Sequence, residues 1–171
     1  MPTPRDIRRL ALLALYQLDA TGAGDPEGVR ASLDDLESLR EEGLVFVDRA
    51  TDFEPPDRDR AFATAVGAWE HREGADAELR ELAPEWPPSR QAAIDRAILR
   101  LAHHEIVRGE SPPKAVVNEA VELAKAFSTE KSPAFVNGIL GKVLKRVLAE
   151  RGDAADAETT EPLEPNGVQE G

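Results

Sequence analysis

Residues 114–127 read KAVVNEAVELAKAF, and residues 132–140 read SPAFVNGIL. In both stretches the apolar residues recur at intervals of three and four, which predicts two amphipathic α-helices. The polar residues 128–131 between them predict a short break. Ser132 is the expected N-cap of the last helix, with Pro133 at its first position. The strongest structural signal in the chain is therefore helical.

Each of these two helices carries an asparagine beside its apolar stripe, Asn118 in the first and Asn137 in the second. A buried amide needs hydrogen-bond partners, and near a helix end it can bond the unpaired backbone groups of a neighbouring helix. Gly138 would let another helix approach closely. We therefore expect Asn118, Asn137 and Gly138 to have a structural role, as a polar clip between the last two helices, rather than a role in ligand binding.

Helical periodicity extends over most of the chain. The predicted helices cover residues 7–18, 26–43, 57–72, 75–82, 90–108 (with Ser89 as the N-cap), 113–127 and the segment from 132 onward. The only β-like run, residues 44–53, has no partner run, and we interpret it as a connector or a helix start. Seven helices joined by short breaks predict an all-α bundle.

The net charge of −12 is unevenly distributed over the 171 residues. Residues 1–18 carry +2 and residues 88–148 carry +4, whereas residues 19–59 carry −9 and residues 149–171 carry −6. The last of these segments has only two large apolar residues, Leu163 and Val168, so it cannot offset its ordering entropy by burial. We predict one helical domain over residues 1–148, followed by a disordered acidic tail over residues 149–171.

Cysteine is absent, which excludes disulfides and cysteine-bound metals and is typical of a reducing cytosol. No apolar run approaches the roughly 20 residues that span a bilayer. The polar N-terminal residues lack the apolar stretch of a signal peptide. These features predict a cytoplasmic protein without a membrane partner.

On a helical wheel of residues 5–19, Arg5, Arg8, Arg9 and Tyr16 fall on one strip about 100° wide. Guanidinium groups can bind phosphates and stack on bases, and tyrosine adds a stacking surface. The strip therefore suits single-stranded RNA. A solvated charged face is the alternative interpretation, and Asp19 returns to the same strip.

The sequence contains no pattern typical of catalysis or metal binding. His103, His104 and Glu105 are consecutive and point about 100° apart on a helix, whereas helical metal ligands need spacings of three or four. We therefore interpret the histidines as surface or partly packed residues. Neither a nucleophile turn nor a glycine-rich phosphate loop is present. We predict that the chain is not an enzyme and binds no cofactor.

The segments RRLALLALYQLD, DRAILRLAHHEI and SPPKAVVNEAVELAKAFSTEKSPAFVNGIL together resemble the NusB family of transcription antitermination factors. The resemblance covers residues 5–147, and VNEAVELAK followed ten residues later by FVNG is its most specific part. It implies an all-α, seven-helix fold of two three-helix bundles. Family members pair with NusE, a small-subunit ribosomal protein, and bind boxA RNA. Their complex joins the elongating RNA polymerase and supports ribosomal RNA synthesis.

The resemblance also implies which residues contact RNA. The family's arginine-rich N-terminal segment is similar to Arg5, Arg8 and Arg9, with Tyr16 nearby. The loop between the last two helices lies toward the RNA, which adds Lys131, and two further candidates are Arg96 and Arg100. We expect weak RNA binding by the chain alone and tighter binding with NusE.

Three alternatives accompany this interpretation. One is a NusB-like module that binds only proteins and has lost its RNA affinity. Another, the RNA-binding domain of an RNA cytosine methyltransferase, lacks the necessary catalytic domain and cysteine nucleophile. Some family members form homodimers that cover the RNA face, so a homodimer is an alternative to a monomer.

Overall fold

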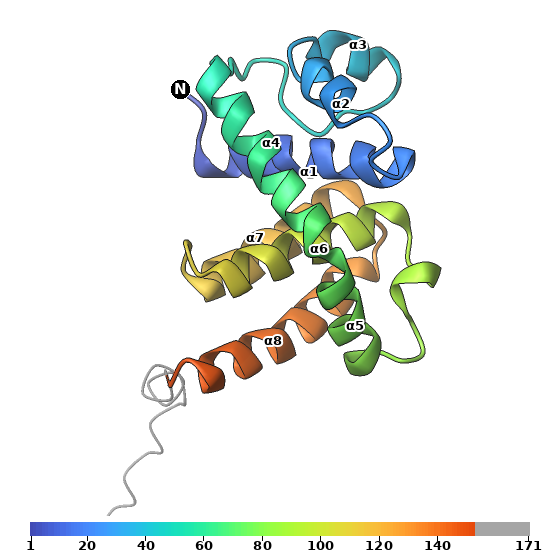
Figure 1. Cartoon of the computed structure of the whole chain (residues 1–171), viewed down its shortest axis with the longest axis vertical. Helices are drawn as coiled ribbons and strands as arrows, with labels where there is room; N and C mark the ends of the chain where they lie inside the picture. Colours follow the sequence, from blue (N-terminus) through green and yellow to red (C-terminus); the bar gives the residue numbers. More distant parts are fainter. Residues whose placement is uncertain (153–171) are drawn as a thin grey trace, which may run out of the picture.

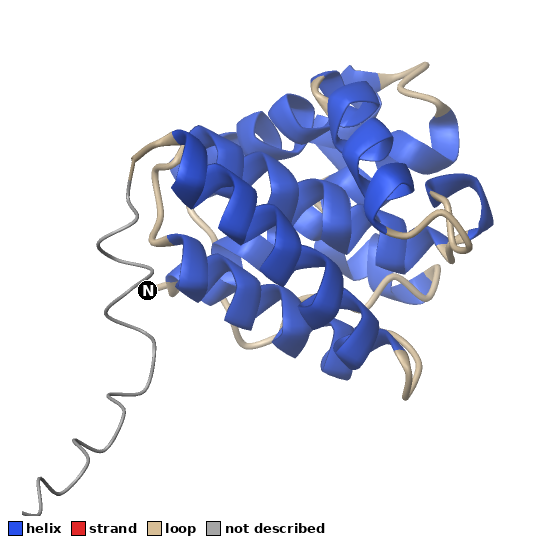
Figure 2. Ribbon diagram, turned by 90° about the horizontal axis from the view of Figure 1, so that it is seen from below, coloured by secondary structure: helices blue, strands red, loops and turns tan. Residues whose placement is uncertain are grey.

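The computed structural model describes residues 1–152, and all regular structure in that range is helical (Figures 1 and 2). The helices are α1 (Pro4–Thr21), α2 (Pro26–Ser32), α3 (Leu36–Glu41), α4 (Pro55–Glu70), α5 (Arg72–Leu82), α6 (Ala93–Arg108), α7 (Pro113–Phe127) and α8 (Ser132–Glu150), with a 3-10 turn at Pro88–Arg90. The all-α prediction is confirmed. The predicted number of seven helices is wrong, because the described residues form eight α-helices.

Two groups of helices share one continuous core. The helices α6, α7 and α8 pack against one another, and α5 covers the side formed by α6 and α8. In the other group α1 packs along α4, and the short α2 and α3 lie beside them (Figure 1). Both α1 and α4 also contact α6, which joins the two groups.

The central position of α1 buries almost its whole circumference. The residues from Leu10 to Leu15 are all at most 1% exposed, because both α4 and α6 pack against this helix. Leu12, which lies within the arginine strip of the helical wheel, is completely buried. The strip therefore presents only its two ends to solvent.

The predicted single helix over residues 26–43 is divided into α2 and α3. Asp35 interrupts it, since its carboxylate accepts hydrogen bonds from the backbone N–H and the hydroxyl of Ser38. An aspartate that bonds the backbone in this way competes with helix continuation and starts a new helix instead. Residues 44–53 form a connector, as expected.

Two predicted helix starts also need correction. The helix α6 begins at Ala93 rather than Arg90, because Pro88–Arg90 forms a separate 3-10 turn. The residue that caps α8 is Lys131, and Ser132 is already helical. The Ser132 hydroxyl is buried and donates to Asp95 at 3.0 Å instead of capping its own helix.

The end of the helical domain lies slightly beyond the predicted boundary at residue 148. The last helix continues to Glu150, so the first residues assigned to the acidic tail are helical. The predicted disorder of the remainder, residues 153–171, lies outside the described residues. Within residues 1–152 no helix has the length and apolar character needed to cross a membrane.

Candidate nucleic-acid interface

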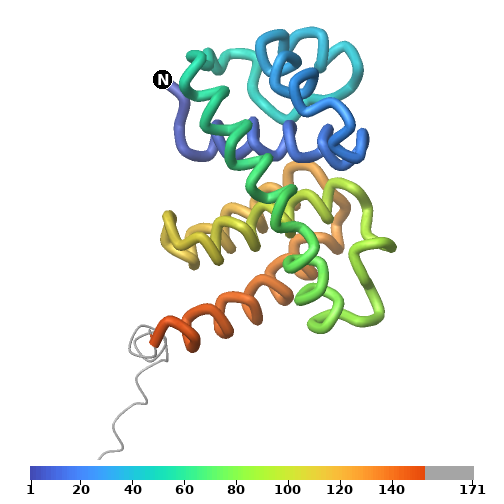
Figure 3. The backbone as a smooth tube through the Cα atoms, viewed as in Figure 1, coloured from blue at the N-terminus to red at the C-terminus, as the bar shows by residue number. Residues whose placement is uncertain are grey.

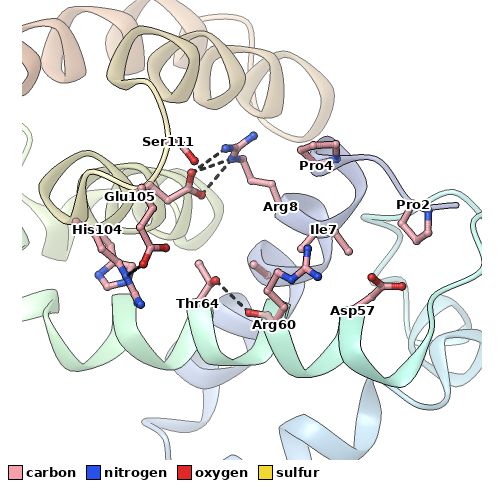
Figure 4. Close-up of a pocket in the computed structure, with 13 residues that line it drawn as sticks. Pro2, Pro4, Ile7, Arg8, Asp57, Arg60, Thr64, His104, Glu105 and Ser111 are labelled. Carbon is pink, nitrogen blue, oxygen red and sulfur yellow. Dashed lines mark hydrogen bonds and ion pairs between the residues drawn. The ribbon is translucent and has the colours of Figure 1, made fainter.

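The α1 arginines point toward α6 and α7, and each has a specific partner there. Arg5 donates two hydrogen bonds of 2.9 Å to Glu119 on α7, and this pair lowers the pKa of the Glu119 carboxyl. Arg8 donates to both carboxylate oxygens of Glu105 on α6, the shortest bond being 2.8 Å (Figure 4). The first pair is accessible, with Arg5 53% exposed, whereas the second is mostly buried.

Arg9 continues the strip toward the C-terminal end of α7. Its guanidinium carbon lies 5.3 Å from the ring centroid of Phe127, a cation–π contact. Its buried Nε has no hydrogen-bond partner. Arg9 is therefore held in place by an aromatic ring rather than by a carboxylate, and its charge is not neutralised by an ion pair within residues 1–152.

Three aromatic rings extend from Arg9 along the same surface. Phe127 meets Phe46 edge to face at 5.1 Å, and Phe46 meets Tyr16 in the same manner at 5.6 Å. All three rings are partly exposed. Of these rings, only Tyr16 could be expected from the sequence; Phe46, which lies in the connector before α4, and Phe127 were not expected. The only signal was the β-like run around Phe46, whose aromatic side chain had no assigned role.

Lys131 lies in the loop that follows Phe127, and within residues 1–152 it forms no ion pair. It lines a cleft of about 730 Å³ together with Trp86 and Phe135. Trp86 is 46% exposed, and the guanidinium carbon of Arg90 lies 5.5 Å from its ring. An exposed tryptophan beside two cations is a suitable stacking surface for a base. The residues PEWPPS (84–89) lie between the predicted helices 75–82 and 90–108, and the sequence pattern gives Trp86 no role.

A buried hydrogen-bond group fixes this loop to the start of α6. The Asp95 carboxylate accepts from the Ser128 hydroxyl at 2.6 Å and from the Ser132 hydroxyl at 3.0 Å. Both serines flank the loop that carries Lys131. These bonds anchor the loop between Phe127 and α8 to the start of α6.

Arg96 and Arg100, expected from the resemblance to contact RNA, are both held in ion pairs within the fold. Arg96 donates to Asp19 and to the carbonyl oxygen of Pro88. Arg100 is only 7% exposed and donates to both Asp19 and Asp76. Burial alone would lower the pKa of the Arg100 guanidinium, but the two carboxylates outweigh burial and raise it. Both arginines hold helices together.

The histidines are more buried than expected, since His103 and His104 are each 8% exposed. His103 shares a 2.8 Å hydrogen bond with Glu78, which also accepts from Arg146. His104 stacks on His71 with ring centroids 5.4 Å apart, and its Nε2 has no partner. Burial lowers the pKa of His104. Among the described residues no three His, Cys, Asp or Glu side chains are grouped as metal ligands would be.

The expected polar clip between the last two helices is not formed. Asn118 and Asn137 are both exposed, and their side chains make no hydrogen bond within residues 1–152. A Cβ atom at Gly138 would meet no atom within 4 Å, so no helix approaches it closely. The apolar stripes of α7 and α8 pack together without these amides, which instead face solvent.

Sequence comparison identifies the family. The sequence model of the NusB family matches residues 5–145. The chain belongs to the NusB family. A transcription antitermination protein NusB of Symbiobacterium thermophilum is 44% identical over 150 residues, covering 82% of this chain and 88% of that protein. One from Roseiflexus sp. is 39% identical over 145 residues, covering 83% and 92%. The resemblance recognised in the sequence is thus confirmed, and these relatives are antitermination factors rather than enzymes.

Solved NusB structures have the same fold. The Thermotoga maritima NusB structure superposes with a TM-score of 0.66 and 28% identity, covering 90% of this chain and 99% of that one. A structure of antitermination factors NusB and NusE in complex with dsRNA matches with a TM-score of 0.64 and 24% identity, covering 83% and 96%. The latter likeness shows the fold, and in that complex a NusB protein is bound with NusE and dsRNA.

Proposed function

We propose that this chain is a transcription antitermination factor that binds boxA-type single-stranded RNA together with NusE. In this role it joins the elongating RNA polymerase in the cytoplasm and supports ribosomal RNA synthesis. Family membership and the solved complex of relatives with NusE and RNA support the proposal. The observation that carries it is the row formed by Arg9, Phe127, Phe46 and Tyr16, which leads to the Lys131 loop.

The row provides both contacts that single-stranded RNA requires. Arg5, Arg9 and Lys131 supply positive charge for phosphates, and the partly exposed rings supply faces on which unpaired bases stack. Base stacking needs splayed nucleotides, so single-stranded RNA fits this surface better than a duplex does. The cation–π contact holds the Arg9 side chain in place before RNA arrives, which reduces the entropy lost on binding.

The three α1 arginines have different roles in this proposal. The exposed Arg5–Glu119 pair is screened by water, so RNA phosphate can replace the carboxylate at little cost. Arg8 is mostly buried with Glu105, so it positions α1 on α6 rather than contacting RNA. Arg9 contacts the RNA directly.

A module that binds only proteins is a second candidate function. The observation in its favour is that Arg5 and Arg8 already have carboxylate partners in the chain itself. In that case Glu119 and Glu105 would permanently neutralise two of the three α1 arginines. The charge of −12 would then disfavour RNA.

Fluorescence anisotropy of a labelled single-stranded boxA RNA separates the two functions. We expect Arg9→Ala/Lys131→Ala to weaken RNA binding about tenfold or more. The slope of the logarithm of the binding constant against the logarithm of the salt concentration should become shallower by about 1.4, because each lost phosphate contact changes this slope by roughly 0.7. The control Arg80→Ala/Lys145→Ala removes two exposed charges elsewhere and should bind like the wild type. Glu119→Gln releases Arg5 and should tighten binding.

Each titration is repeated with NusE and with a double-stranded competitor of the same sequence. Tighter binding with NusE, lost in Arg9→Ala/Lys131→Ala and resistant to the duplex, supports the proposal. If NusE is captured but RNA is bound in no combination, the chain is a protein-interaction module. If the duplex competes fully, single-strand recognition is wrong.

A further inference from the structure

A second cleft lies at the N-terminal end of α1, where α1, α4 and α6 meet (Figure 4). Its volume is about 330 Å³. The charged side chains of its lining are Arg8, Arg60, Arg108, Asp57, Glu105 and Glu110. Three of these side chains are cationic and three are anionic, but they differ in whether they already have an ion-pair or hydrogen-bond partner.

Two of the acids already have firm partners. The Glu105 carboxylate accepts hydrogen bonds from Nε and Nη2 of Arg8, and both side chains are mostly buried. Asp57 accepts the backbone N–H of Glu54 at 2.9 Å and so caps the start of α4. Neither carboxylate is available to a second cation at the mouth of the cleft.

Two of the cations are weakly engaged. Arg60 is exposed and forms no ion pair within residues 1–152. Arg108 pairs only with Glu110, and these side chains are 53% and 68% exposed. Exposed pairs of this kind contribute little and exchange readily. The mouth of the cleft therefore presents two guanidinium groups to an incoming anion.

The end of α8 is tied to the same place. Arg151 donates to the backbone carbonyl oxygens of Ile106 and Val107 at 3.1 and 2.6 Å. Its guanidinium also lies against Gly109, where an added Cβ would be only 3.0 Å from Nη2. The N-terminus, the α6–α7 connection and the end of α8 all lie on one side of the molecule (Figure 3). The chain thus leaves its last described residues beside Arg108.

The sequence that follows is anionic throughout. Residues 153–171 contain six acids and neither lysine nor arginine. Three of the acids, Asp153, Asp156 and Glu158, come within six residues of Gly152. Six residues span at most roughly 20 Å. The carboxylates of Asp153, Asp156 and Glu158 are therefore within roughly 20 Å of Gly152 along the chain, close enough to reach the mouth of the cleft.

We propose that residues 153–171 dock on this cleft, with their carboxylates on Arg60 and Arg108. The docked segment replaces Glu110 as the partner of Arg108 and gives Arg60 a partner. It also places negative charge at the N-terminal end of α1, the helix that carries Arg5, and so competes with RNA phosphates. This last consequence rests on the proposed RNA-binding function, whereas the docking itself does not.

A spin label on the full-length chain tests the docking without RNA. The sequence has no cysteine, so Ala157→Cys gives a single attachment site between two acids. A matched chain carries the same label with the six acids of residues 153–171 changed to amides. Paramagnetic broadening of the α4 amides 57–64 should be at least about twofold stronger in the acidic chain at 50 mM salt. The difference should vanish at about 500 mM, where screening is strong.

Two further variants locate the contact. Arg60→Gln/Arg108→Gln should remove the extra broadening, and the control Arg80→Gln/Lys125→Gln should retain it. Equal broadening in the acidic and amidated chains overturns the docking. Broadening centred on Lys142 and Lys145 of α8 also overturns it, because the segment then lies on a different surface.

The regulatory consequence has its own measurement. The amidated full-length chain should bind the boxA RNA about threefold to tenfold more tightly at 50 mM salt, since one or two exposed pairs are removed, and equally at 500 mM. Docking with unchanged RNA affinity overturns the regulation and leaves the docking intact. Docking by a chain that binds no RNA removes the proposed function instead.

Discussion

The ion pairs of Asp19 provide the sharpest test of how the interface is positioned. Asp19 lies near the end of α1 and accepts hydrogen bonds from both Arg96 and Arg100 of α6. Asp19→Asn retains the shape of the side chain and removes its charge. Arg96 then loses its only carboxylate, and the buried Arg100 retains Asp76 alone.

Removing one partner of a buried ion pair costs about 3–5 kcal/mol. The asparagine oxygen still accepts one hydrogen bond and Asp76 still pairs with Arg100, so we expect a loss of about 2–3 kcal/mol. For a chain of this size that corresponds to a fall in melting temperature of roughly 4–12 °C. Urea unfolding at pH 7, followed by the helical circular dichroism signal, measures the difference in unfolding free energy.

The control is Asp59→Asn, which breaks an exposed pair with Arg30 and should cost less than about 1 kcal/mol. An unfolding free energy of Asp19→Asn within about 0.5 kcal/mol of the wild type would refute the structural role of the pairs. Tighter RNA binding by a fully stable Asp19→Asn would show that Arg96 and Arg100 contact RNA after all, because the substitution frees them for phosphates.

Three other substitutions have distinct expected results. Gly67→Ala should destabilise the fold by about 1–2 kcal/mol in urea unfolding, because its Cβ would lie 2.7 Å from the buried His104 ring. At Gly74 an added Cβ meets no atom within 4 Å, so the matched Gly74→Ala should stabilise α5 by about 0.5–1 kcal/mol. Ser132→Ala removes a donor to the buried Asp95 and should cost about 1–2 kcal/mol, measured as a shift in thermal midpoint. Because the pKa of His104 is lowered in the folded chain, its imidazole binds a proton more readily in the unfolded chain. The contribution of His104 to the free energy of unfolding is therefore largest above pH ~6.5 and falls as the pH decreases below that value. In calorimetry, His104→Gln should make stability depend less on pH between pH 7 and 5. An unchanged pH dependence would show that other groups cause it.

Local periodicity was enough to predict most of the helices. The bounds of α7 agree with the sequence prediction because its apolar stripe ends at proline on one side and at polar residues on the other. The family, too, could be recognised from the sequence of α7 and α8. Both signals are local, so the sequence contains them completely.

The environment of each arginine could not be predicted, because the partners are distant in sequence. The helical wheel assumes one buried face, but both α4 and α6 pack against α1, so Leu12 within the strip is buried and Arg8 is only 14% exposed. Arg100 was a candidate for RNA contact only through the family resemblance, and its partners Asp19 and Asp76 come from two other helices. Likewise, only the absence of a side chain at Gly67 makes room for the His104 ring.

The long-range pairs of α1 have a consequence for how the protein is made. The partners of Arg8 and Arg5 follow them by 97 and 114 residues. A ribosome therefore releases the first helix long before Glu105 and Glu119 exist, and its leucine-rich centre has no core to enter. The arginines acquire their final orientation only when α7 has emerged. A nascent chain of this protein is thus unable to form these ion pairs, or the contact between Arg9 and Phe127, until the polypeptide is nearly complete.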